Sequence, residues 1–167
     1  MKKIVFLAML TVCFINIKAQ NQNFDFLRGV EELDVELDYS IAKFEKKWAS
    51  DFFMLENSRN PNWEIEYKKE MLIKFVISAN SYLPSWCIIK ENFQNAKYKI
   101  IVKVIKLDDD KDTDANILIV EKNSGEILAQ FSVYGAAGTF GSFKNLSGDA
   151  MENVGKKAGK FLAKKIR

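Results

Sequence analysis

The chain has 167 residues, 48% of them apolar, with 25 Lys and Arg against 22 Asp and Glu and no histidine. Without histidine, Ser–His and Cys–His nucleophiles and histidine-based metal sites are excluded. The low proline count and the high apolar content argue against a disordered chain and for one packed core.

The first nineteen residues have the layout of a secretory signal peptide. A positive start at Lys2 and Lys3 is followed by an apolar run from Ile4 to Ile17 and then by the small residue Ala19. A bilayer-spanning helix needs roughly 18 or more apolar residues, and this run is shorter. We therefore expect an exported protein, periplasmic or extracellular, with cleavage after Ala19.

Cys13 offers an alternative to simple cleavage. The stretch Leu10–Cys13 loosely resembles the lipobox at which a bacterial lipoprotein is acylated. Val12, however, stands where a small residue is needed, and the apolar run continues beyond the cysteine. The sequence therefore favours cleavage over lipidation.

Removing residues 1–19 changes the composition of the remaining chain. Three lysines and no acids are lost, which leaves 22 basic and 22 acidic residues. A mature chain with a net charge near zero does not favour nucleic-acid binding. Cys87 is then the only cysteine, so no intramolecular disulfide is expected. We interpret residues 20–29 as a loose N-terminal arm and residues 30–167 as a single domain.

The first half of the domain predicts one strand and two helices. Apolar and acidic residues alternate over residues 32–39, which is typical of a half-buried strand. Apolar residues at helical spacing then predict a helix from Ser40, its N-cap, to about Phe53. After a polar break at residues 55–60, Pro61 suits the first turn of a second helix, which ends before Pro84.

The second half predicts a sheet and a closing helix. Strands are expected at residues 86–89, 98–107, 116–121 and 126–134. Asn123–Gly125 is a hairpin turn signal, and Asn145 or Ser147 caps a helix that runs to about Lys165. The order β-α-α-β-β-β-β-α predicts an α+β fold, a two-layer sandwich whose mainly antiparallel sheet carries its helices on one face.

Opposite charges occupy one face of two predicted strands. If these strands are neighbours, each cross-strand pair contributes a few tenths to about 1 kcal/mol. We expect this pairing rather than a divalent-cation site on the acidic strand. The residues are Glu32, Asp34, Glu36 and Asp38 on the first strand, and Lys97, Lys99 and Lys103 on the second.

The acidic turn between two predicted strands resembles the start of a calcium loop. Asp108, Asp110 and Asp112 occupy positions one, three and five of such a loop. Position six should be glycine and is Thr113, and position twelve should be glutamate and is Ile119. Weak metal binding by the three aspartates is therefore an alternative to a solubilising hairpin tip.

A glycine-rich loop precedes the closing helix. Gly138, Gly141 and Lys144 are candidates for anion binding at the helix N-terminus, although the loop matches neither phosphate-binding fingerprint. The simplest interpretation is a connection that needs glycine for its backbone conformation. If Phe140 and Phe143 point outward instead, they form an apolar tip that contacts a partner or a membrane surface.

The closing helix has an apolar face and a basic face. The apolar face suits packing on the sheet, with the basic face in water. Lys156, Lys160 and Lys164 lie on the basic face, and contact with a membrane surface or an anionic polymer is the alternative use for them.

The C-terminal third contains the segments Gly138–Phe143, Gly148-Asp149 and Gly155–Leu162, and Ser78–Asn80 and Tyr98–Lys106 lie upstream of it. Together these segments resemble small exported proteins of unknown function from Bacteroidetes-type bacteria. The resemblance implies no known chemistry. The order of elements is also similar, at the level of the fold alone, to envelope accessory domains of the TolB-N-terminal or LpoB kind.

These observations predict a non-enzymatic binding or accessory module of the cell envelope that uses no cofactor. Its expected partner is another envelope protein or the membrane surface, contacted through the glycine and phenylalanine loop and the basic helix. A small-ligand or divalent-cation binder is the alternative. A carboxylate-dependent hydrolase of envelope polymer is less favoured, because nothing in the spacing of the acids singles out two.

Overall fold

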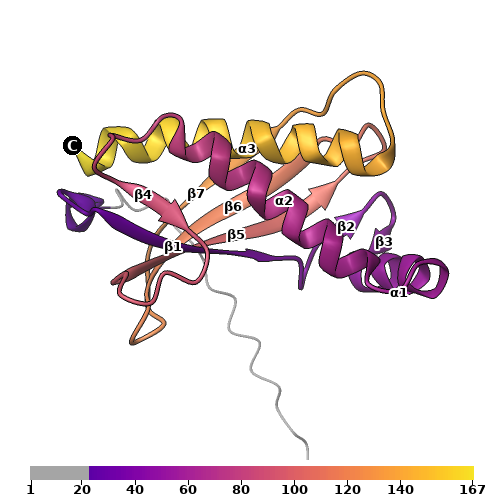
Figure 1. Cartoon of the computed structure of the whole chain (residues 1–167), viewed down its shortest axis with the longest axis horizontal. Helices are drawn as coiled ribbons and strands as arrows, with labels where there is room; N and C mark the ends of the chain where they lie inside the picture. The colour runs from indigo at the N-terminus through magenta and orange to yellow at the C-terminus, as the bar shows by residue number, and fades with distance from the viewer. Residues whose placement is uncertain (1–22) are drawn as a thin grey trace, which may run out of the picture.

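A seven-stranded mixed sheet carries helices on one face (Figure 1). The computed structural model describes residues 23–167, so the predicted signal peptide and Cys13 lie outside the described residues. The helices are η1 (Asp25–Leu27), α1 (Ala49–Arg59), α2 (Trp63–Asn80) and α3 (Phe143–Ile166). The strands are β1 (Glu32–Asp38), β2 (Lys43–Phe44), β3 (Lys47–Trp48), β4 (Ile88–Lys90), β5 (Tyr98–Leu107), β6 (Thr113–Glu121) and β7 (Ile127–Gly135).

Strand β5 lies at the centre of the sheet. It pairs in parallel with β1 and, near its C-terminal end, with β2, while its other edge pairs antiparallel with β6. Strand β7 continues the antiparallel side, and β4 adds to β1 in parallel. The predicted α+β class is confirmed, but the sheet is mixed, because the crossover through α1 and α2 returns the chain to the same end of the sheet.

The predicted helix over residues 40–53 begins later than expected. Residues 43–48 form the short β2–β3 hairpin, and α1 begins at Ala49 and continues through the predicted polar break to Arg59. Phe44 faces the core, whereas Trp48 remains 50% exposed, so the two aromatic side chains do not share one helix face. The helical spacing of these residues was therefore misleading.

The N-terminal segment packs against the domain. Phe24 and Leu27 are buried, and the Gly29 N–H donates to the carbonyl of Ile166 at the end of α3 (3.0 Å between N and O). The ring of Phe24 also lies edge-on to Phe161. The prediction of a loose arm is wrong for residues 23–29, because Phe24 and Leu27 bury apolar surface beside the C-terminal helix.

The charge pairing predicted between two neighbouring strands is confirmed for two pairs on the open face of the sheet. Lys99 Nζ lies 2.9 Å from Glu36 Oε2, and Lys103 Nζ lies 3.5 Å from Asp38 Oδ2. Lys97 instead lies over the ring of Tyr98. Glu36 and Asp38 of β1 therefore have partners on β5.

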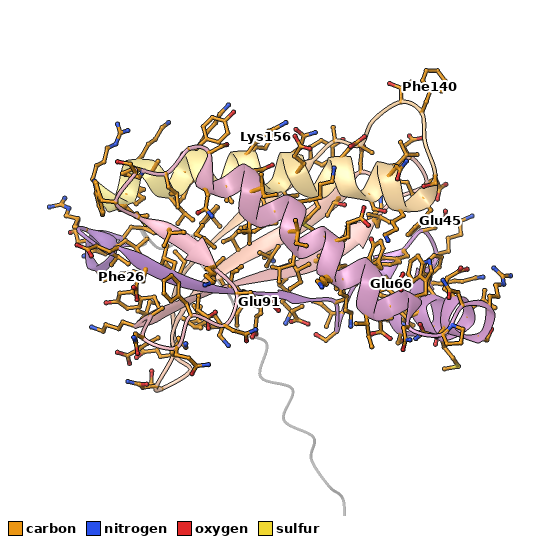
Figure 2. The ribbon with its side chains drawn as sticks, in the orientation of Figure 1. Phe26, Glu45, Glu66, Glu91, Phe140 and Lys156 are labelled. Atoms are coloured by element: carbon orange, nitrogen blue, oxygen red, sulfur yellow. The ribbon has the colours of Figure 1, made fainter. Side chains whose placement is uncertain are left out.

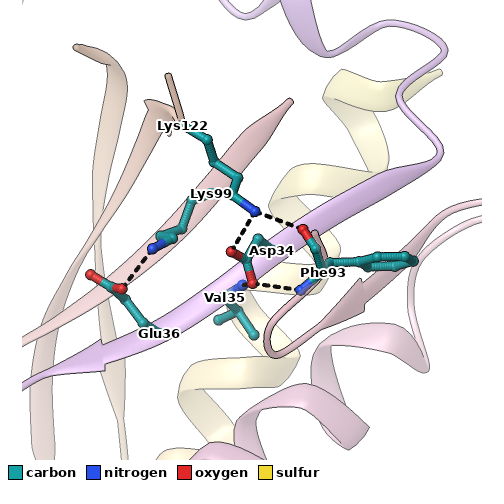
Figure 3. A network of polar contacts seen from close by, with 6 residues as sticks. All are labelled: Asp34, Val35, Glu36, Phe93, Lys99 and Lys122. Carbon is teal, nitrogen blue, oxygen red and sulfur yellow. Dashed lines mark hydrogen bonds and ion pairs between the residues drawn. The ribbon is translucent and has the colours of Figure 1, made fainter. Parts of the chain in front are cut away.

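Asp34 is the buried member of the acidic row (Figure 3). One carboxylate oxygen accepts the N–H groups of Val35 and Phe93, and the other lies 3.1 Å from Lys122 Nζ. Burial alone raises the pKa of this carboxyl group, but the hydrogen bonds from Lys122, Phe93 and Val35 outweigh it and the net pKa is lowered. The ionised form thus ties β1 to the loop after β4 and to the end of β6.

Replacing Asp34 tests this network. We expect Asp34→Ala to lower the free energy of unfolding by about 2 kcal/mol at neutral pH, because Lys122 and two N–H groups lose their acceptor. A lowered folded-state pKa gives stability above the unfolded pKa, near 4, and that stability is lost as pH falls through the folded pKa. Urea titrations at neutral pH and near pH 3 should therefore show a smaller difference between variant and wild type in acid.

The control for Asp34 is Glu36→Ala, which removes an exposed ion pair. This change should lower the free energy of unfolding by less than about 1 kcal/mol. Equal losses for Glu36→Ala and Asp34→Ala would contradict the importance of the buried carboxylate.

Two glycines allow α2 and α3 to lie in very close contact. A Cβ atom at Gly155 would lie 2.5 Å from the carbonyl oxygen of Phe75, and one at Gly159 would lie 2.3 Å from that of Ala79. Both obstacles are backbone atoms of α2, which cannot rotate away. The two helices therefore form one layer over the sheet.

Alanine substitutions along α3 test this contact. Gly159→Ala should lower the free energy of unfolding by about 1–3 kcal/mol, because the added methyl group forces the helix backbones apart. Gly148→Ala is the matched control, since its nearest neighbours would be side-chain atoms at 3.6 and 3.7 Å. It should raise stability by about 0.5–1 kcal/mol through helix propensity. Chemical denaturation measures the free energy of unfolding of both variants. An increase for Gly159→Ala would disprove the steric argument.

Candidate functional site

The loop between β7 and α3, residues 136–142, is held by hydrogen bonds at its beginning. The Ala137 N–H donates to Asp112 Oδ1 (2.8 Å), and Asn153 Nδ2 donates to the carbonyl of Ala136 (2.7 Å). Asp112 also accepts a hydrogen bond from the Tyr134 hydroxyl, and this bond lowers the pKa of the carboxyl group. The beginning of the loop is therefore anchored to the sheet and to α3.

Phe140 stands at the tip of this loop and is 92% exposed. Figure 2 shows it at the outermost point of the loop, beyond the start of α3, on the same margin of the molecule as Lys156. Gly141 follows with a φ of +152°, a conformation that favours glycine. A large apolar side chain is thus displayed to solvent by an anchored loop.

Phe143 has a different environment. It is the first residue of α3, and its ring stacks on Phe52 with centroids 4.7 Å apart. The rings of Phe44 and Trp63 belong to the same cluster, with their centroids 6.0 and 6.1 Å from that of Phe143. Phe140 is therefore exposed, as the apolar-tip alternative requires, whereas Phe143 packs against the core; contact of the tip with a partner stays a prediction.

Serine substitutions at the two positions should have opposite consequences for stability. Phe143→Ser should lower the free energy of unfolding by about 2 kcal/mol or more, because it removes a ring from the aromatic cluster. Phe140→Ser should leave it within about 0.5 kcal/mol. Thermal and urea unfolding measure both, and a large loss for Phe140→Ser would show that the tip packs against the domain.

The N-terminus of α3 differs from the predicted anion site. The N-cap is Ser142, whose hydroxyl accepts the Asn145 N–H at 3.3 Å, and Ser147 lies inside the helix. Lys144 Nζ lies 2.7 Å from Glu70 Oε2 on α2. A Cβ atom at Gly138 would lie 2.4 Å from Asp149 Oδ2. The structure therefore places a carboxylate next to Gly138 and directs Lys144 to an acid, so Gly138, Gly141 and Lys144 do not form an anion site.

Asp108 and Asp112 of the acidic turn form hydrogen bonds within the fold, Asp108 inside the turn and Asp112 to Tyr134 and Ala137. Asp108 Oδ1 accepts the N–H groups of Asp110 and Asp112 at 3.1 and 3.0 Å. Asp108 and Asp110 also line a shallow hollow together with Lys46 and Lys106. Among residues 23–167, no three acidic or cysteine side chains are grouped so that they could hold a metal ion.

The lysines of α3 differ in how far their charges are compensated. Lys156 Nζ lies 2.6 Å from Glu152 Oε1, and this hydrogen bond raises the pKa of Lys156. Lys160 Nζ lies 4.7 Å from the centre of the Tyr82 ring on the adjoining turn. Within the described part of the chain, Lys160 and Lys164 form no ion pair. The basic helix therefore presents at least two uncompensated positive charges.

The sequence patterns did not single out two exposed isoleucines on α2. Ile73 is 47% exposed and Ile77 is 65% exposed, one turn apart. The buried residues Met71 and Phe75 define the opposite side of the helix. The available signal was the position of Ile73 and Ile77 outside the apolar stripe, where a polar residue is the ordinary choice.

Comparisons with known proteins give only a distant likeness. No family model and no curated protein matches the chain. A PelC dodecamer from Paraburkholderia phytofirmans is similar over 84% of this chain and 90% of that chain, at 11% identity and a TM-score of 0.41. Protein XCC0632 from Xanthomonas campestris, of family DUF330, is similar over 82% and 85%, at 12% identity and a TM-score of 0.44. Likeness at this level carries no argument about activity, and the expected resemblance to exported Bacteroidetes-type proteins stays a prediction.

Proposed function

We propose that this protein is a non-enzymatic, exported accessory module that binds another component of the cell envelope. It does so through Phe140 and the basic face of α3, which includes Lys156, Lys160 and Lys164. The observation that carries the proposal is the 92% exposure of Phe140 on a loop that hydrogen bonds anchor to the sheet and to α3. Export rests on the signal-peptide pattern of residues 1–19.

An anchored phenylalanine is an effective contact residue. Burying a Phe side chain is worth about 1.5–3 kcal/mol relative to leaving it in water. Because the hydrogen bonds at Ala136 and Ala137 already restrict the loop, less conformational entropy is lost when it meets a partner. The exposed ring therefore supports binding more than it supports folding.

The distribution of charge supports the same surface. On the open face of the sheet, Lys99 and Lys103 each have an acidic partner on β1. On α3, Lys160 and Lys164 have no such partner among the described residues. Uncompensated positive charges attract anionic groups and raise association rates at low ionic strength. The helical side of the molecule is therefore the side we assign to a partner.

The nucleophile chemistry of the chain supports a binding role. Histidine is absent from the sequence. Cys87 is buried, and burial, with a smaller contribution from Glu31, raises the pKa of its thiol to about 11. A thiol with that pKa is protonated at neutral pH and is a poor nucleophile.

Capture from envelope extracts tests the proposal. We expect the mature wild-type protein to retain an envelope component and both Phe140→Ser and the double variant Lys160→Glu/Lys164→Glu to lose most of it. Ile127→Ser is the matched control, because Ile127 is 56% exposed at the start of β7 and lies outside the proposed surface. Equal capture by all four proteins would refute the role of the loop and of the helix.

A further inference from the structure

We propose that the component bound by this surface is an anionic lipid bilayer, an inference that rests on the proposed function. The contact surface, here called the outer helical surface, consists of Phe140 on the loop, Ile73 and Ile77 on α2, and Lys160 and Lys164 on α3. Its members come from the loop before α3 and from α2 and α3, the two helices that cover one face of the sheet (Figure 1). The protein would lie on the membrane without crossing it, and within residues 23–167 no helix has the length and apolarity of a membrane span.

The two isoleucines point away from the sheet. Met71, Phe75 and Ala79 turn one side of α2 into the protein interior. At about 100° per residue, Ile73 and Ile77 lie on the opposite side of the helix. Their exposed fractions of 47% and 65% agree with this geometry.

Contacts between the helices show where Lys160 lies relative to α2. Gly159 lies against the backbone of Ala79, two residues after Ile77. Lys160 reaches back over the ring of Tyr82, and Glu152 on α3 lies 4.0 Å from Lys74 on α2. Lys160 therefore lies near the C-terminal end of α2, and both helices expose their outer sides on the face of the sheet that they cover (Figure 1).

This arrangement fits a bilayer surface better than it fits a folded protein. The apolar groups stand apart, with charged side chains between them, whereas the centre of a protein interface is a contiguous patch depleted of charge. At a membrane, apolar side chains enter the boundary between headgroups and acyl chains, and lysines remain at the phosphates. Each lysine near an anionic surface strengthens binding by about fivefold.

The opposite face of the molecule provides an internal contrast. There, Glu36 and Asp38 neutralise Lys99 and Lys103, and Asp34 neutralises Lys122. We therefore expect a negatively charged bilayer to be attracted more strongly to the helical side, where Lys160 and Lys164 have no acidic partner among the described residues, than to the sheet side.

Vesicle sedimentation tests the inference directly. The mature chain, residues 20–167, is mixed with vesicles of phosphatidylcholine alone or of phosphatidylcholine containing phosphatidylglycerol. We expect binding to the anionic vesicles only, weakened as added salt shortens the Debye length. Equal partition to both vesicle types, or no partition to either, would overturn the proposal.

Variants locate the contact on the molecule. Lys160→Glu/Lys164→Glu should weaken binding to anionic vesicles by about 25-fold or more. Ile73→Ser/Ile77→Ser and Phe140→Ser should each weaken it by about fivefold or more. The controls Lys46→Glu/Lys47→Glu and Ile127→Ser change exposed residues elsewhere and should bind like wild type. Circular dichroism confirms that each variant is folded, and loss of binding in the controls to the same extent would also overturn the proposal.

The two proposals fail in different ways. If vesicles are not bound but an envelope protein is captured in a Phe140-dependent manner, the proposed function stands and the bilayer is wrong. If neither vesicles nor any envelope component depends on the outer helical surface, both proposals are wrong.

Discussion

The close packing of α2 on α3 is the constraint on which the rest of the structure depends. Gly155 and Gly159 bring the two helix backbones together, since any side chain there would strike the carbonyls of Phe75 and Ala79. The consequence is a single helical layer instead of two independent helices on a sheet. The same contact places Gly159 against Ala79, so that Lys160, the next residue of α3, reaches the ring of Tyr82 just beyond the end of α2.

Charge is handled differently on the two sides of the protein. On the sheet side, parallel pairing of β1 with β5 sets Asp38 opposite Lys103, and the same row ends at the buried carboxylate of Asp34. These charges contribute to folding because each has a partner in the fold. On the helical side, Lys164 has no counter-charge among the described residues. Lys160 and Lys164 therefore carry positive charge that the described residues do not pair, although residues 20–167 together hold as many basic as acidic residues.

The sequence predicted those parts of the fold that rest on local pattern. Alternation and β-branched residues marked the long strands, and the α+β class followed from them. The parallel direction in which β1 pairs with β5 could not be predicted, because residues 39–97, which include α1, α2 and three short strands, separate the two strands. The helix prediction for residues 43–48 was wrong for another reason. Phe44 and Trp48 are four residues apart, a spacing that fits one face of a helix as well as the two strands of a hairpin. Tertiary contacts of Phe44 decided between them.

The candidate site was predictable in its location but not in its composition. Phe140 and Phe143 are similar side chains three residues apart, and no periodicity distinguishes them. The position at which α3 begins does distinguish them. Ser142 is the N-cap, so Phe143 is the first residue of the helix and its ring packs on that of Phe52. Phe140 lies before the helix and stays in the loop. A helix boundary is the least certain part of a sequence-based prediction, and here it separates a core residue from an exposed one. The display of Phe140 is therefore a consequence of where α3 begins.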